Sequence, residues 1–70
     1  MNRERVSSSS IKSVGYDPDA EILEVELGHG GVYQYFDVPG RVYDDLINAS
    51  SKGRYFNVYV KDVYRFRRLK

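Results

Sequence analysis

The chain has 70 residues, of which 41% are hydrophobic and 30% charged, with a formal net charge of +1 and no cysteine. A chain this short forms one domain with a small core. The lack of cysteine excludes disulfides, thiolate nucleophiles and cysteine-based zinc sites, and it favours a reducing compartment. No apolar run approaches the ~18 residues that a membrane span needs. We therefore expect a soluble, cytoplasmic protein that does not enter a membrane.

Charge is separated along the chain. Residues 52–70 contain seven basic side chains and one acidic one, a net charge of +6, whereas residues 16–51 contain eight acidic side chains and one basic one, a net charge of −7. A basic segment with interspersed aromatic residues is typical of a surface that contacts an anionic partner.

Residues 1–8 are polar and serine-rich, so we expect a flexible N-terminus followed by a single domain over residues 9–70. Two strand-like runs, residues 11–16 and 22–27, flank a turn at residues 17–20, where proline and aspartate favour a reversal. The second run alternates apolar and acidic side chains, which predicts a strand with one face exposed to water. In the first run Lys12 falls on the apolar side, so its alternation is less regular.

Glycines at positions 28, 30 and 31 predict a second tight turn, and Val32–Phe36 then forms a third strand. The three strands make an antiparallel meander. Tyr33 and Tyr35 share one face of this sheet, and the register decides whether that face is the core side or the solvent side.

The period changes at Pro39, after which apolar residues recur at helical spacing and predict a first helix over residues 39–49. A second apolar stripe, which includes Phe56 and Tyr59 as core contacts, predicts a helix over residues 51–60. The alternative is a strand, because Tyr, Phe and Val dominate this segment. We predict an α+β fold of three strands followed by two short helices, with an extended basic tail over residues 64–69.

Four fragments resemble the KTSC domain: Ser8–Ile11, Tyr33–Tyr35, Val38-Pro39 with Val42-Tyr43, and Ser51–Asn57. This family is named for the C-terminus of some lysyl-tRNA synthetases and also occurs as free-standing bacterial proteins. The resemblance covers residues 7–69. It implies three strands followed by two helices, which supports the helical interpretation of residues 51–60, and its association with a synthetase implies RNA as a partner.

The basic tail is the main candidate for a functional surface. Its arginines alternate with Tyr64 and Phe66, a pattern that suits phosphate contact combined with base stacking. Our first hypothesis is therefore an RNA-binding module. Its candidate residues are Arg54, Lys61, Arg65, Arg67 and Arg68 for phosphates, and Tyr33, Tyr35 and Tyr64 for stacking.

Three alternatives to this RNA interface remain open at the level of the sequence. Tyr33 and Tyr35 could pack beneath the helices as part of the core. The cations of the tail could instead pair with acids of the same molecule, particularly Glu24 and Glu26. Acidic and basic faces of different protomers could also associate head to tail, although a monomer is our default.

A protein-interaction module is the second hypothesis, because a three-stranded sheet leaves edges to which a partner strand can add. We do not expect an enzyme, a metal or a cofactor. His29 is the single histidine and falls in a predicted turn, and the serines at positions 7–10 have no base assigned to them.

Overall fold

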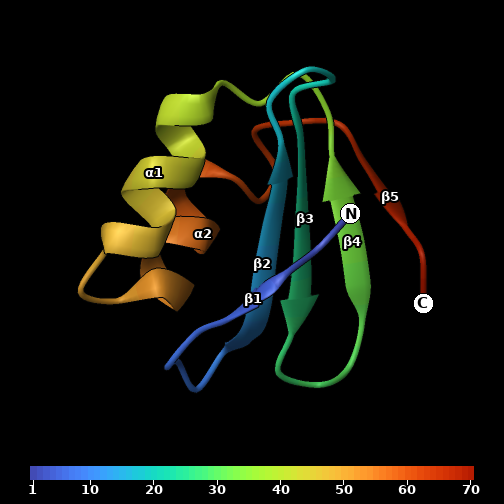
Figure 1. The fold of residues 1–70 in the computed structure, drawn as a ribbon. Helices are drawn as coiled ribbons and strands as arrows, with labels where there is room; N and C mark the ends of the chain where they lie inside the picture. The colour runs from blue at the N-terminus through green and yellow to red at the C-terminus, as the bar shows by residue number, and fades with distance from the viewer.

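The computed structural model describes residues 1–70, which form a five-stranded antiparallel sheet and two helices. The strands lie in the sheet in chain order, so each one pairs with its neighbours in sequence (Figure 1). Neither helix is long and apolar enough to cross a membrane. The predicted α+β class is confirmed. The strands are β1 (Glu4–Arg5), β2 (Ile11–Asp17), β3 (Ile22–Leu27), β4 (Val32–Tyr35) and β5 (Phe66–Arg68), and the helices are α1 (Gly40–Asn48) and α2 (Lys52–Tyr59).

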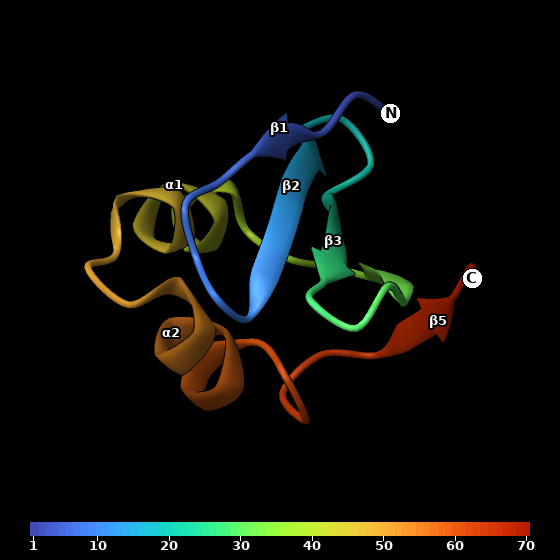
Figure 2. The ribbon, with the colours of Figure 1, turned by 90° about the horizontal axis from the view of Figure 1, so that it is seen from below.

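The core lies between one face of the sheet and the two helices. Figure 2 shows both helices beside β2, whereas β5 lies at the far edge of the sheet. Alternating side chains of the central strands point into this layer, as the period of two requires. The buried cluster consists of Ile11, Val14, Leu23, Val25 and Tyr35 from the sheet, with Val38, Leu46, Phe56 and Val60 from the helical side.

The irregular alternation of the first predicted strand has a structural cause. The register between β2 and β3 shifts between Ile11 and Ser13. This irregularity lets Ile11 and Val14 both enter the core while Lys12 stays exposed. The turn that follows β2 forms as predicted, because the Asp17 carboxylate accepts hydrogen bonds from the backbone N–H groups of Asp19 at 3.0 Å and Ala20 at 3.2 Å.

The predicted number of strands is wrong: the sheet has five strands rather than three. One additional strand, β1, lies within the N-terminal segment that we expected to be loose. Gly15 makes this pairing possible, because a Cβ atom at that position would lie 2.6 Å from the backbone oxygen of Asn2. Figure 1 shows the segment before β1 crossing the sheet on the side away from the helices.

The second additional strand comes from the tail. Residues 66–68 pair with β4, in the register Tyr33 with Arg68, Gln34 with Arg67 and Tyr35 with Phe66. The tail is therefore the edge strand of the sheet and not a separate extended segment. Its alternation of aromatic and basic residues has the period of a strand, because successive side chains of β5 point to opposite faces.

Both predicted helices are present, with bounds close to those expected from the sequence. The hydroxyl of Ser51 caps α2 by accepting a hydrogen bond from the backbone N–H of Arg54 at 3.4 Å. The prediction that Tyr59 is a core contact is wrong. Phe56 and Val60 face the sheet, whereas Tyr59 is 56% exposed and its ring lies 4.7 Å from that of Tyr55. Tyr59 is the last residue of α2 and lies on the solvent side of the predicted apolar stripe.

Candidate functional site

Four aromatic rings form a continuous row from the core to the surface, which we call the aromatic row: Phe56, Tyr35, Phe66 and Tyr33. The centroid of the Tyr35 ring lies 5.5 Å from that of Phe56 and 5.8 Å from that of Phe66. The Phe66 ring in turn lies 5.9 Å from Tyr33. Tyr35 is 4% exposed, Phe66 is 57% exposed and Tyr33 is half-buried, so the row runs from the core to the surface.

The aromatic row lines a pocket of about 520 Å³ between α2, the turn that follows β3, and the β4–β5 edge of the sheet. Helices cover the face of β2, but β5 lies away from them, so the end of the row stays open (Figure 2). Polar side chains of Asn57, Lys61 and Arg68 line the same pocket, and all three residues are exposed. The pocket therefore combines aromatic surfaces with accessible polar groups, as small-ligand sites do.

Arg68 holds its guanidinium group over the open end of the aromatic row. The guanidinium carbon lies 5.6 Å from the centroid of the Tyr33 ring, within cation–π range. Its Nε donates a hydrogen bond to the backbone oxygen of Lys70 at 2.7 Å. The two ion pairs of the chain join Arg3 to Glu24 and Arg65 to Asp37. Neither Lys61 nor Arg68 forms an ion pair with an acidic side chain, and the exposed Asp62 lines the same pocket beside them.

Tyr35 is a neutral phenol at the inner wall of the pocket. Burial is the main cause, with smaller contributions from the neighbouring Tyr33 and Asp62, and together they raise the pKa of its hydroxyl to about 12. The hydroxyl is therefore protonated at neutral pH and can both donate and accept a hydrogen bond.

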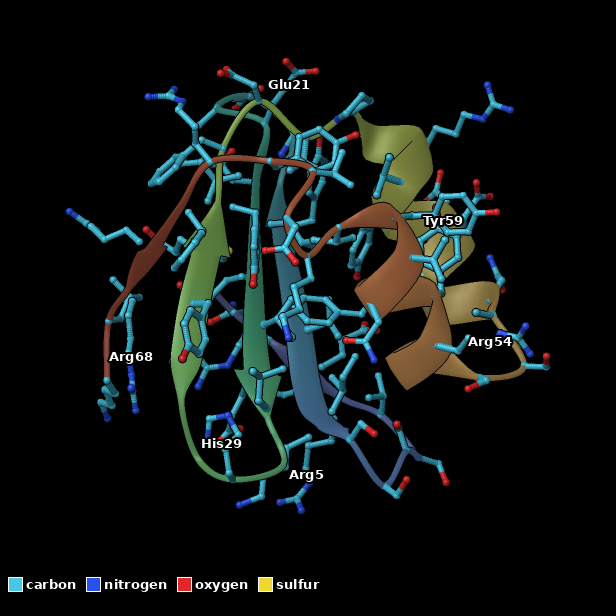
Figure 3. All side chains as sticks on the ribbon, turned by 180° about the vertical axis from the view of Figure 1, so that it is seen from behind. Arg5, Glu21, His29, Arg54, Tyr59 and Arg68 are labelled. Carbon is cyan, nitrogen blue, oxygen red and sulfur yellow. The ribbon has the colours of Figure 1, made fainter.

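The structure brings half of the predicted site residues together. Tyr33, Tyr35, Lys61 and Arg68 line one pocket. Arg54, on α2, lies on the other side of the molecule from Arg68, on the same side as Tyr59 (Figure 3). The remaining three predicted residues, Arg65, Arg67 and Tyr64, also lie outside the pocket.

Arg65 and Arg67 are separated from Arg68 by the alternation of the strand. Arg67 donates to the side-chain oxygen of Gln34 at 3.4 Å, on the face of the sheet opposite the helices. Arg65 lies beside the exposed Asp37 carboxylate at 3.3 Å, and its guanidinium carbon is 5.9 Å from the Phe36 ring centroid. The predicted alternation of basic and aromatic residues in the tail therefore places its cations on two different faces of the sheet.

The alternative in which the tail cations pair with acids of the same molecule holds for Arg65, which pairs with Asp37, but not for Glu24 and Glu26. Glu24 is paired with Arg3 from the N-terminal segment, and it also accepts a hydrogen bond from the side-chain amide of Gln34 at 2.9 Å. Glu26 accepts from the Ser13 hydroxyl at 3.0 Å. These acids are satisfied on the face away from the helices, which leaves the cations of the pocket free.

Phe66 and Asn57 line the pocket but were not among the predicted site residues. If residues 66–68 had been predicted as a strand, Phe66 and Arg68 would have been placed on one face of the sheet and Arg67 on the other. That period-two pattern was the signal for Phe66. Gly53, in the first turn of α2, lies against Ser10: a Cβ atom there would lie 2.8 Å from the Ser10 side chain.

Comparison with known proteins gives a consistent result. The family model of the KTSC domain matches residues 7–64. An uncharacterized protein of Stutzerimonas stutzeri is 46% identical over 70 residues, covering 99% of both chains. The crystal structure of a KTSC domain protein from Yersinia pestis is 42% identical, covers 99% of this chain and 97% of its own, and superposes with a TM-score of 0.96.

A further relative is much longer. A lysine–tRNA ligase of Nostoc punctiforme is 43% identical over 61 residues, which are 87% of this chain and 11% of the ligase. The similarity is thus confined to a small part of that enzyme.

Proposed function

Because this chain belongs to the KTSC domain family, we propose that it is a small non-enzymatic binding module that holds single-stranded RNA in the pocket between α2 and the β4–β5 edge. The proposal rests on one observation: an aromatic row opens into a pocket beside two cations, Lys61 and Arg68, that form no ion pair with an acidic side chain. Base–aromatic stacking combined with phosphate contacts is the usual means of binding single strands. Similarity to part of a lysine–tRNA ligase supports RNA as the polyanion.

Each side chain has a defined role in this proposal. Tyr33 and Phe66 offer ring surfaces to bases, and stacking contributes about 1–3 kcal/mol per base on such surfaces. Lys61 and Arg68 contact phosphates on either side of the stacked base. The absence of cysteine agrees with the cytoplasm, where cellular RNA is found. No catalytic role is proposed for His29, whose Nδ1 accepts a hydrogen bond from the Gly31 backbone N–H at 3.3 Å within its turn.

Salt dependence tests the proposal. With two phosphates contacted, the logarithm of the association constant should fall against the logarithm of salt concentration with a slope of about −1.4, since each single-strand contact contributes about −0.7. We expect Arg68→Ala and Lys61→Ala each to reduce the slope by about 0.7. Fluorescence anisotropy of a labelled single-stranded RNA measures both quantities.

Arg65→Ala is the matched control, because Arg65 belongs to the same tail but lies outside the pocket. It should leave the affinity and the slope nearly unchanged. Absence of RNA binding at low salt rejects the proposal. Equal losses from Arg65→Ala and Arg68→Ala reject the pocket as the site.

Strand addition at β5 is a second candidate function, favoured by the free edge of the sheet. In the antiparallel register, the backbone N–H and C=O groups of Arg67 point toward β4. The backbone groups of Phe66 and Arg68 therefore point away from the sheet, where they can pair with a partner strand. Replacing Arg68 with proline removes one of these edge N–H groups. A protein partner that is retained after nuclease treatment, but lost with Arg68→Pro and kept with Arg68→Ala, supports this function instead.

A further inference from the structure

Tyr35 is a buried residue whose hydroxyl has no hydrogen-bond partner within the chain. The side chain is more than nine-tenths buried, yet its oxygen makes none of the hydrogen bonds found in the structure. Tyr16 shows the usual arrangement, since its hydroxyl donates to the backbone oxygen of Val38 at 2.6 Å. Buried tyrosine hydroxyls normally find such a partner, so the free one at Tyr35 requires an explanation.

The pocket supplies that explanation. No fully enclosed side-chain polar atom in the chain lacks a hydrogen-bond partner. The Tyr35 oxygen has none, so it must retain some contact with solvent, and the cavity that its side chain lines is the pocket beside α2. The hydroxyl is therefore a hydrogen-bonding group in a cavity that is lined in part by the aromatic row, where a ligand can reach it.

We propose that the pocket receives one unpaired nucleobase, with its ring against Phe66 and Tyr33 and its polar edge at the Tyr35 hydroxyl. This inference rests on the proposed function and specifies its ligand. A volume of about 520 Å³ suits a group of nucleotide size. Bases in a duplex are stacked and paired, so they cannot enter such a cavity without being extruded. The module should therefore prefer single strands to duplexes.

Asn57 provides a second polar contact for the base. This residue comes from α2, faces solvent and lines the same pocket. Its amide offers both donors and an acceptor, and the Tyr35 hydroxyl offers one donor and an acceptor. The two groups lie on different elements, one on the helix and one on the sheet, so together they can read a planar edge held between those layers.

Three RNA probes of equal length test the inference by anisotropy: a single strand, the same strand with abasic ribose units, and a duplex. The base-containing single strand should bind at least about tenfold more tightly than the other two, because only it supplies a base for stacking. Tyr35→Phe keeps the ring and removes the oxygen. It should weaken binding of the base-containing strand about 3- to 10-fold and leave abasic binding unchanged.

Tyr55→Phe is the control for loss of a tyrosine hydroxyl, since Tyr55 is a half-buried tyrosine that lies outside the pocket. Phe66→Ala removes an exposed ring and should weaken the binding of base-containing RNA by about tenfold. Thermal denaturation shows whether Tyr35→Phe is folded, and if it is not, Phe66→Ala provides the test in its place. Equal affinity for the base-containing and abasic strands overturns this inference and leaves RNA binding intact. No binding of any probe overturns both.

Discussion

Glu24 is a buried carboxylate in the middle of the sheet, and its charge is paired with that of Arg3, near the N-terminus. It is 5% exposed and contacts both the Arg3 guanidinium and the Gln34 amide. Arg3 also donates from Nε to the Ser13 hydroxyl at 2.9 Å. These bonds fix the N-terminal segment across the face of the sheet that the helices leave open, so a single arginine joins β1 to the interior of the molecule.

Replacing Arg3 with alanine should destabilise the fold, because the buried Glu24 carboxylate would lose its charged partner. We expect a loss of about 1–3 kcal/mol in the free energy of unfolding, measured by urea denaturation. Arg5→Ala is the control from the adjacent strand β1, since Arg5 is exposed and its replacement should change stability by less than about 0.5 kcal/mol. Similar losses for the two variants would argue against a specific role for the Arg3–Glu24 pair.

Tyr35 predicts a loss of stability in alkali. Burial raises its pKa from 10.0 to about 12 in the folded protein, so between these values the folded state keeps a proton that the unfolded state has released. The stabilisation is complete below pH 10 and is lost as the pH rises through about 12. Tyr35→Phe should reduce this loss. Urea denaturation at pH 9 and pH 11 measures it, and an unchanged pH dependence in the variant would show that other tyrosines are responsible.

The two edge strands show how elements too short to be recognised locally are made by pairing. β1 has two residues and β5 has three, and each is held by the strand beside it. β5 turns the basic tail into a surface with two sides: Phe66 and Arg68 reach the pocket, while Arg67 contacts Gln34 on the other face. The function of the tail therefore depends on its strand geometry as well as on its charge.

The contact between α2 and the start of β2 depends on Gly53. An alanine normally stabilises a helix by about 1 kcal/mol relative to glycine. At this position its Cβ would lie 2.8 Å from the Cβ and Oγ of Ser10, so we expect Gly53→Ala to destabilise the protein by about 1–3 kcal/mol. Thermal denaturation checks this expectation. Adding Ser10→Gly to Gly53→Ala removes both clashing atoms and should recover much of the lost stability. If Gly53→Ala alone were more stable than the parent protein, the packing described here would be contradicted.

At the scale of the whole molecule, the acidic and basic blocks of the sequence do not neutralise each other. Glu24 is paired with the N-terminal Arg3, and the single ion pair between the blocks, Arg65 with Asp37, is exposed on both sides. Exposed pairs contribute little to stability, about 0–1 kcal/mol. What holds the molecule together is the apolar layer between sheet and helices, and its small size makes each member important.

Leu46 is the one fully buried side chain of α1, and truncating it should remove a large part of the total stability. We expect Leu46→Ala to cost about 2–5 kcal/mol, against a total of about 5–15 kcal/mol for a domain of this kind. Val63→Ala, at an exposed position, should change stability by less than about 0.5 kcal/mol. Calorimetry measures both, and comparable changes for the two would show that α1 is not packed as described.

Local patterns in the sequence were enough to predict the class of the fold, both helices and the first hairpin. The apolar spacing around Leu46, the Ser51 cap and the Asp17 turn act within a few residues, so their effects can be read from neighbouring positions. The resemblance to the KTSC domain rested on such local fragments and is confirmed by the match over residues 7–64.

Tertiary structure alone decided the number of strands and the composition of the candidate site. β1 and β5 exist because strands distant in sequence supply their hydrogen-bond partners, and Arg68 joins Tyr33 because β4 and β5 pair over a separation of more than 30 residues. Sequence determined which charges and rings were available. Which of them share a pocket was decided by strand register, because a shift of one residue would move Arg68 to the opposite face.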